Sequence, residues 1–290
     1  MLIVDVFAEH PLEGNQLGVF PDAAAYDDRF MQALARELNF SETTFISGQG
    51  PDGSWRVRIF SPEKEFPFAG HPTLGTAWVI RNLLSEEPPD EVTLDLRIGK
   101  VPVAFEEGET TEDGIPWLTS PAVTLGATVP PATIAAALGL DVNDLDPTSP
   151  VQLASVGLTS VMVPVRSLEV LGRCRPDPDA FHAAGVPLHT YVFCRQARDP
   201  AHQMAARFFF EANGPREDPA TGSATAAFGR YALEHRLFGE RFDLRIEQGV
   251  EMGRPSLLRL EGSRPEGVPV IHVGGRVRPV SKGALFSSVR

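Results

Sequence analysis

Alternating apolar and polar positions predict several short strands along the chain. They are LIVDVF (2–7), WRVRIF (55–60), VTLDL (92–96), VPVAFE (101–106), HTYVFC (189–194), MAARFFF (204–210) and SLLRLEG (256–262). Helical spacing occurs at Phe30, Leu34 and Leu38, where Asp27 or Asp28 would serve the first turn. Because strands dominate and do not alternate regularly with helices, the pattern predicts an α+β fold and not a doubly wound sheet.

Two short stretches resemble each other at a distance of half the chain. FPFAGHPTLGTAWVI, residues 66–80, predicts a helix from Pro72 that is apolar around most of its circumference, as buried helices are. EDPATGSA begins at Glu217 and aligns Asp218 with His71 and Pro219 with Pro72, an offset of 147 in 290 residues. We therefore predict two similar domains, each with a buried central helix.

The domain boundary is expected in the acidic, turn-rich segment EEGETTEDGIP, residues 106–116. This gives an N-terminal domain at 1–112 and a C-terminal domain at 113–290. The last segment, GGRVRPVSKGALF at 274–286, is expected to return to the first domain as a strand.

Composition narrows the classes of protein. A net charge of −12 disfavours nucleic acid and acidic membrane surfaces as partners. No apolar run is long enough to span a bilayer, and two cysteines, Cys174 and Cys194, are too few for a disulfide framework. The sequence has no phosphate-binding loop and no dinucleotide fingerprint, so nucleotide sites lack their usual markers. Its histidines do not have the spacing of metal ligands, so no metal site is expected. We expect a cytoplasmic enzyme or binding protein.

The openings of the two central helices are candidate ligand sites. Helix N-termini attract carboxylates and phosphates, so we expect an anion near Gly70–Thr73 and near Thr221, Gly222 and Ser223. Asp218 is a natural N-cap before Pro219, whereas His71 is a poor one. Both residues also fit plain roles, Asp218 as a structural cap and His71 in core packing. If the two domains pack about a pseudo-twofold axis, His71 and Asp218 would line one cleft that holds a small carboxylic acid.

Glu42 is a third candidate, in the stretch NFSETTFI at 39–46. Ser41 and Glu42 fit an exposed turn after the preceding helix. Alternatively, the apolar neighbours Phe40 and Phe45 would raise the pKa of the Glu42 carboxyl, and such a group can carry a proton near neutral pH.

Taken together, these stretches resemble the PhzF family of phenazine-biosynthesis-like isomerases. The resemblance rests on VDVFAEHPLEGNQLGVF, SETTF, EFPFAGHPTLGTA, EDPATGSA, EQGVEMGRPS and IHVGGRV. It implies a diaminopimelate epimerase-like fold, with a sheet curled round a central helix in each of two domains and an active site between them. It also implies a homodimer without metal or organic cofactor, and an activity similar to isomerisation of trans-2,3-dihydro-3-hydroxyanthranilate.

Carried over by motif, the resemblance makes Glu42, His71 and Asp218 the catalytic residues, with Gly222 and Ser223 binding substrate. The related epimerases use two cysteines in the equivalent openings. Because neither opening has a cysteine here, a two-thiol racemase mechanism is excluded. Gln16 stands where the family often has proline, so the substrate is expected to differ if that loop borders the cleft.

Three hypotheses about function follow. The first is an isomerase in which Glu42 moves a proton on a conjugated carboxylic acid while His71, Asp218 and the second helix opening bind it. The second is a non-catalytic small-carboxylate-binding protein that retains the fold. The third, a hydrolase built on Ser223, ranks last because no GxSxG motif or paired base is found.

Overall fold

The computed structural model describes residues 1–108, 110, 113–211 and 214–286, and the chain divides into two compact units. Unit 1 comprises Met1–Leu118 and Gly274–Arg290, and unit 2 comprises Thr119–Val273. The expected boundary after residue 112 falls at positions 111 and 112, which lie outside the described residues. The division itself follows Leu118, within a strand.

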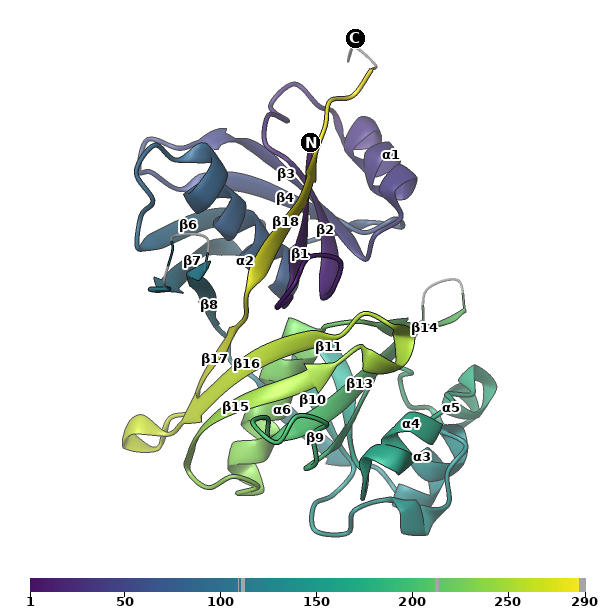
Figure 1. Ribbon diagram of the computed structural model, residues 1–290. Coiled ribbons are helices and arrows are strands. Elements are labelled where there is room, and N and C mark those ends of the chain that lie inside the picture. Colours follow the sequence, from purple (N-terminus) through teal and green to yellow (C-terminus); the bar gives the residue numbers. More distant parts are fainter. Residues whose placement is uncertain (109, 111–112, 212–213, 287–290) are drawn as a thin grey trace. The chain divides into compact units, whose positions relative to one another are not determined.

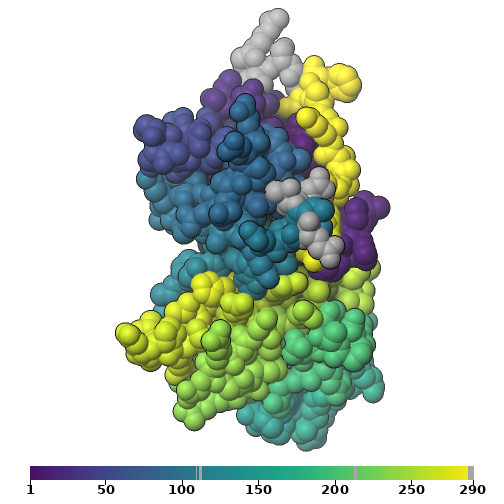
Figure 2. Space-filling model, turned by 60° about the vertical axis from the view of Figure 1, so that its left-hand side comes forward, coloured from purple at the N-terminus to yellow at the C-terminus, as the bar shows by residue number. Residues whose placement is uncertain are grey.

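Unit 1 is built on one mixed sheet. Its strands are β1 (Leu2–Val6), β2 (Asn15–Phe20), β3 (Glu42–Gln49), β4 (Trp55–Phe60), β5 (Glu65–Phe66), β6 (Glu91–Leu96), β7 (Gly99–Glu106), β8 (Ile115–Thr119) and β18 (Val277–Lys282). The order is β18-β1-β2-β3-β4-β6-β7-β8, parallel at β2–β3 and β4–β6 and antiparallel elsewhere, with β5 beside β4. β18 therefore brings the end of the chain alongside its beginning (Figures 1 and 2).

The central helix of unit 1 is α2 (Gly70–Val79), and all of its residues are buried. It contacts β1, β2, β3, β6 and β7, so the sheet curls around it (Figure 1). At Gly75 an added Cβ would lie 2.7 Å from side-chain atoms of both Leu17 and Val6, so glycine permits the close approach of helix and sheet. A π-helical turn, η1 (Ile80–Leu84), continues α2.

A second helix of unit 1, α1 (Asp28–Leu38), packs on β3 and β4. The predicted cap is confirmed, since the Asp27 side chain accepts from the Phe30 N–H at 2.8 Å. Beneath α1 lies a small core in which the rings of Phe20 and Phe45 stack at 5.0 Å.

Unit 2 also contains one mixed sheet. Its strands are β9 (Thr124–Thr128), β10 (Gln152–Val156), β11 (Leu158–Pro164), β12 (Thr190–Cys194), β13 (Met204–Glu211), β14 (Pro215–Asp218), β15 (Arg241–Gln248) and β16 (Ser256–Ser263). A further strand, β17 (Val270–Gly274), follows them along the chain. The order is β9-β10-β11-β12-β13-β15-β16, parallel at β11–β12 and β13–β15 and antiparallel elsewhere, with β14 beside β13.

The helices of unit 2 lie on both faces of its sheet. They are α3 (Pro131–Ala137), α4 (Leu168–Arg173), α5 (Pro178–Ala184), α6 (Gly222–Glu234) and the short 3-10 turns η3 (Val142–Asp144), η4 (Val250–Met252) and η5 (Pro265–Gly267). α6 contacts β9, β10, β11 and β16, and its Phe228 ring lies 4.7 Å from that of Phe193. α3, α4 and α5 cover a separate core that includes Ile134, Phe181 and Val192.

The two units repeat one topology. In unit 1, β1–β2 is antiparallel, β2–β3 is parallel and β3–β4 is antiparallel, and β4 also pairs with the short antiparallel strand β5 and with the parallel strand β6. In unit 2 the strands β10 to β15 pair in the same order, with β14 as the short strand. The central helices α2 and α6 occupy the same place, after the short strands β5 and β14. The predicted pair of similar α+β domains, each with a buried central helix, is confirmed.

The predicted starts of the central helices were wrong. α2 begins at Gly70, before Pro72, and α6 begins at Gly222 with Thr221 as N-cap, so Asp218 is not the cap. Asp218 is instead the last residue of β14 and pairs with Phe208 of β13. Its pairing with β13 keeps Asp218 in the strand, and the chain continues through Pro219 and Ala220 to the N-cap Thr221 before the helix begins.

Candidate active site

In unit 1 the Glu42 carboxylate lies beside the His71 imidazole. Glu42 opens β3, which pairs with β2, and His71 stands in the first turn of α2. Glu42 Oε2 is 3.5 Å from His71 Nδ1, and the two side chains are 18% and 5% exposed. The structure therefore brings together two of the predicted catalytic residues, and Glu42 belongs to a strand and not to an exposed turn.

Phe45 does not contribute the apolar neighbourhood expected for Glu42. Side chains alternate along a strand, so Glu42 and Phe45 point to opposite faces of β3. Thr44, on the Glu42 face, accepts a 2.8 Å hydrogen bond from Thr76 of α2, whereas Phe45 packs in the core under α1. The raised pKa of Glu42 stays a prediction without this support.

His71 is held as a neutral imidazole. Burial lowers its pKa to about 3, and a backbone hydrogen bond with Gln16 opposes this only in part. Asn15 of β2 places its amide nitrogen 3.4 Å from Nδ1, so Nδ1 has contacts with both Asn15 and Glu42. Nε2 is buried and has no hydrogen-bond partner among the described residues. A buried ring nitrogen without a partner is the kind of group that a ligand satisfies.

Both central helices begin without a side-chain cap. At α2 the N-cap is Ala69, and at α6 it is Thr221, whose side chain does not cap the helix. Three of the outer helices, α1, α4 and α5, are capped by Asp27, Ser167 and Asp177, whereas α3 has no side-chain cap either. The first N–H groups of the two central helices therefore have no hydrogen-bond acceptor from the side chain of an N-cap residue.

The predicted binding residues of α2 are placed at this opening. Gly70 is the first residue of the helix and is buried, so a ligand would approach its backbone without a side chain in between. Thr73 is also buried, and its hydroxyl donates a 2.7 Å hydrogen bond to the Ala69 carbonyl. The Thr73 proton is thus used within the first turn, which leaves its oxygen as an acceptor only.

In unit 2 a hydrogen-bonded triad organises the opening of α6. The Thr221 hydroxyl donates to Asp218 Oδ2 at 2.6 Å and accepts from Gln248 Nε2 at 3.1 Å. Gln248 also donates to the Asp218 carbonyl at 2.9 Å, and its Oε1 accepts from the Thr221 N–H at 3.3 Å. Asp218 and Gln248 are 8% and 1% exposed, so the triad holds the Asp218 carboxylate in one orientation.

Gly222 and Ser223 follow directly as the first residues of α6. Gly222 is buried and Ser223 is half-buried. The Ser223 hydroxyl has no hydrogen-bond partner within the described part of the chain. Beneath this opening an added Cβ at Gly249 would lie 2.6 Å from the Pro219 carbonyl, so only glycine fits between β15 and the Asp-Pro segment.

Sequence reasoning missed Asn15 and Gln248. Both lie inside stretches that carried the family resemblance, GNQLGV and EQGVEMG, and both are buried polar residues at strand ends. A polar amide at the inward-facing end of an apolar strand was the available signal. Because Glu42 and His71 belong to unit 1 and Asp218 to unit 2, their expected shared cleft stays a prediction.

Other chemical groups in the structure are less well placed for catalysis. Both cysteines are buried and free, and burial raises the pKa of Cys174 to about 12, so its thiol is a poor nucleophile. In the described ranges no three His, Cys, Asp or Glu side chains gather closely enough to hold a metal ion. None of the helices described has both the length and the apolarity needed to cross a membrane.

The chain is similar to known proteins along nearly its whole length. A family model described as phenazine biosynthesis-like protein, PhzC-PhzF, matches residues 4–283. An uncharacterized isomerase of Mesorhizobium japonicum is 36% identical over 298 residues, with 98% of each chain covered. A trans-2,3-dihydro-3-hydroxyanthranilate isomerase of Pseudomonas aeruginosa is 35% identical over 291 residues, again with 98% of each chain covered.

Solved structures show the same fold. The crystal structure of a PhzF-family phenazine biosynthesis protein of Bacillus anthracis superposes with a TM-score of 0.87 at 26% identity, covering 97% of this chain and 96% of that one. A probable proline racemase of Agrobacterium radiobacter, at a TM-score of 0.57 and 16% identity, shares the fold alone. The predicted diaminopimelate epimerase-like fold class is confirmed.

Proposed function

This chain belongs to the phenazine biosynthesis-like (PhzC-PhzF) family, and we propose that it is an isomerase that moves a proton on a small cyclic or conjugated carboxylic acid. The activity would be similar to that of the trans-2,3-dihydro-3-hydroxyanthranilate isomerases, two of which are 35% and 33% identical to this chain over 98% of its length. General acid–base catalysis by Glu42 is the mechanism proposed.

One observation carries the proposal: a partly exposed carboxylate, Glu42, lies 3.5 Å from a buried, neutral histidine at an uncapped helix opening. With His71 neutral, the pair carries at most the one negative charge of Glu42. That carboxylate can accept a proton from carbon, and the free Nε2 of His71 is left for the substrate.

The proton transfer balances without a further reactant. Glu42 takes a proton from a carbon of the substrate, and the electron pair of that C–H bond moves into the conjugated system of the substrate. The carboxylic acid thus formed on Glu42 returns the proton to a different carbon, which restores the carboxylate. Positive partial charge at the helix openings stabilises the negative charge on the intermediate.

Residues of both units are included in the proposal. His71, Gly70 and Thr73 would bind and orient the substrate from unit 1, and Asp218, Thr221, Gly222 and Ser223 would do so from unit 2. Support comes from the repeated topology, which puts the same uncapped helix opening in each unit, and from the rigid Thr221–Gln248 support of Asp218.

The test is hydrogen exchange in D₂O with a panel of cyclic amino and hydroxy acids, including trans-2,3-dihydro-3-hydroxyanthranilate. Mass spectrometry should find deuterium in one compound, together with its isomer. Because Gln16 departs from the usual family motif, the panel includes acids with other ring substituents. Saturable binding of an acid without exchange or isomerisation would instead identify a non-catalytic carboxylate-binding protein.

Independence of metal and organic cofactors belongs to the proposal, as do a homodimer and a cytoplasmic location. These rest on the family resemblance and, for the location, on the two free cysteines. Dialysis against a chelator should leave the exchange rate unchanged, and light scattering should give twice the chain mass of 31.5 kDa.

A further inference from the structure

A hollow of about 510 Å³ lies in unit 2 and is not used by the proposed reaction. Its walls come from the end of α4 and the residues after it, from β13, from β14 and from η4. The lining residues are Gly172, Cys174, Arg175, Pro176, Arg207, Phe209, Pro215, Arg216, Glu217 and Glu251. This volume is in the range of small-molecule sites.

The hollow lies on the opposite face of the sheet from Asp218. In the β13–β14 pair, Phe209 faces Glu217 and Phe208 faces Asp218. Side chains alternate between faces along a strand, so Phe209 and Glu217 point one way, and Phe208 and Asp218 point the other. Phe209 and Glu217 therefore line the hollow from the face away from Asp218, which makes it a separate site from the opening of α6. Arg216, which pairs with Phe210 and starts from the Asp218 face, reaches the hollow around the edge of β14.

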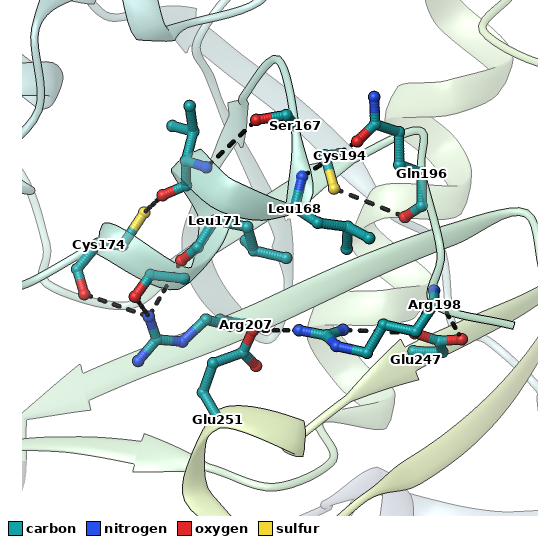
Figure 3. Close-up of polar contacts among 12 residues, drawn as sticks. Ser167, Leu168, Leu171, Cys174, Cys194, Gln196, Arg198, Arg207, Glu247 and Glu251 are labelled. Carbon is teal, nitrogen blue, oxygen red and sulfur yellow. Dashed lines mark hydrogen bonds and ion pairs between the residues drawn. The ribbon is translucent and has the colours of Figure 1, made fainter.

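The floor of the hollow is a buried ion pair between Arg207 and Glu217. Arg207, 5% exposed, donates from Nε and Nη2 to the two oxygens of Glu217, both at 2.8 Å. Its Nη1 donates to the carbonyls of Leu171 and Cys174 at 3.0 and 3.2 Å, as Figure 3 shows. Arg207 thus fixes the end of α4 against β13 and β14, and these bonds use four of its five N–H donors.

The rim of the hollow, by contrast, has two arginine side chains that form no ion pair among the described residues. Glu217 is paired with Arg207, and Glu251 is paired with Arg198, which Figure 3 also shows. Arg175 and Arg216 line the hollow too, are exposed, and have no carboxylate within ion-pair distance among the described residues. Two unpaired arginines at one hollow are notable in a chain whose net charge is −12.

We propose that this hollow binds a small organic anion. Arg175 and Arg216 would hold its carboxylate or phosphate group, because the planar guanidinium matches both groups with paired hydrogen bonds. The apolar part of the ligand would lie against Pro176 and Pro215. Phe209, only 3% exposed and with the Arg207 guanidinium 4.6 Å from its ring centroid, would form the wall behind them.

The test follows backbone amide NMR signals of Gly172 and Arg216 while benzoate, phenyl phosphate, inorganic phosphate or benzamide is added. Benzoate or phenyl phosphate should shift both signals saturably below about 10 mM. Benzamide, the neutral counterpart of benzoate, should bind at least about fivefold more weakly, because its charge-assisted bonds are lost. Comparing benzoate with phenyl phosphate tells which anionic group the site prefers, and inorganic phosphate shows what the anionic group contributes alone.

Variants make the assignment specific. Arg175→Gln and Arg216→Gln should each weaken binding about fivefold. Arg241→Gln is the matched control, since Arg241 is an exposed arginine of β15 outside the hollow and its loss changes the net charge equally. No saturable shift, an equal loss in Arg241→Gln, or shifts confined to Gly222 and Ser223 would overturn the proposal.

Discussion

The Thr221 hydroxyl connects Asp218 to Gln248: it donates to the Asp218 carboxylate at 2.6 Å and accepts from the Gln248 amide at 3.1 Å. The Thr221 side chain therefore connects the end of β14 to the start of α6, with Gln248 supporting both. The carboxylate that the proposal assigns to substrate binding is oriented by this neighbour.

Replacing Thr221 tests that orientation. Thr221→Val keeps the shape but removes both hydrogen bonds, so we expect a loss of about 1–2 kcal/mol in unfolding free energy and a several-fold higher KM. Thr221→Ser restores the hydroxyl and should recover most of both. Urea denaturation and steady-state kinetics measure the two effects, and a valine variant equal to wild type would show that Asp218 needs no such support.

Gln248 was not among the predicted site residues, but we expect its replacement to lower the stability of the fold. Gln248→Leu leaves the Asp218 carbonyl and the Thr221 N–H without this buried partner, which should cost about 1–3 kcal/mol. Gln203→Leu is the control, because Gln203 is an exposed glutamine of the same unit that also hydrogen-bonds to backbone. Thermal denaturation should rank Gln248→Leu clearly below Gln203→Leu, and equal losses would contradict the account.

Neutral His71 should make the protein less stable in acid. Its folded pKa of about 3 lies below the value of about 6.5 expected when unfolded, so the unfolded state binds more protons between these two pH values. The contribution of neutral His71 to the free energy of unfolding is complete above pH 6.5 and falls as the pH drops, by roughly 2 kcal/mol at pH 5.

The comparison is urea unfolding at pH 7 and pH 5 for wild type, His71→Gln and His10→Gln, where His10 is exposed. His71→Gln should lose less stability between the two pH values than wild type, whereas His10→Gln should match wild type. A His71 ring that titrates near pH 6.5 or above by NMR would instead mean that the pair is Glu42⁻ with a protonated histidine.

Gly75 should resist even a methyl group. In Gly75→Ala the new Cβ meets Leu17 and Val6 side chains at 2.7 Å, and we expect a net loss of about 1–2 kcal/mol despite the higher helix propensity of alanine. Gly172→Ala, where no atom lies within 4 Å of the new Cβ, is the helical control and should be neutral or stabilising. Equal midpoints for the two variants in thermal unfolding would argue against tight packing of α2.

Periodicity in the sequence predicted the elements that depend on local pattern. WRVRIF coincides with β4, and the apolar circumference of the helix predicted from Pro72 identified α2 as buried. The similarity of GHPTLGTA to EDPATGSA predicted the repeat, which strand pairing then confirmed. Local pattern sufficed here because burial on all sides leaves only apolar and small residues along a helix.

Features that depend on tertiary pairing were not predictable in this way. The N-cap of α6 was wrongly assigned to Asp218 because the sequence does not show that β13 holds this residue in a strand. Phe45 was expected beside Glu42 because the two residues are close in sequence. Once β3 forms, however, their side chains point to opposite faces of the strand. Asn15 and Gln248 were missed because only the folded chain brings each amide next to a site residue that is distant in sequence, His71 for Asn15 and Asp218 for Gln248.

The most direct test of the central claim is hydrogen exchange by Glu42→Gln. Glutamine keeps the shape of the side chain but cannot accept the proton, and a general acid–base group typically contributes 10²–10⁴-fold, or roughly 3–5 kcal/mol of barrier. Glu42→Asp keeps the acid at shorter reach and should retain a fraction of the rate. We predict that Glu42→Gln still binds the substrate identified by the panel but incorporates deuterium at least about 10²-fold more slowly than wild type; incorporation at the wild-type rate would show that the base lies elsewhere.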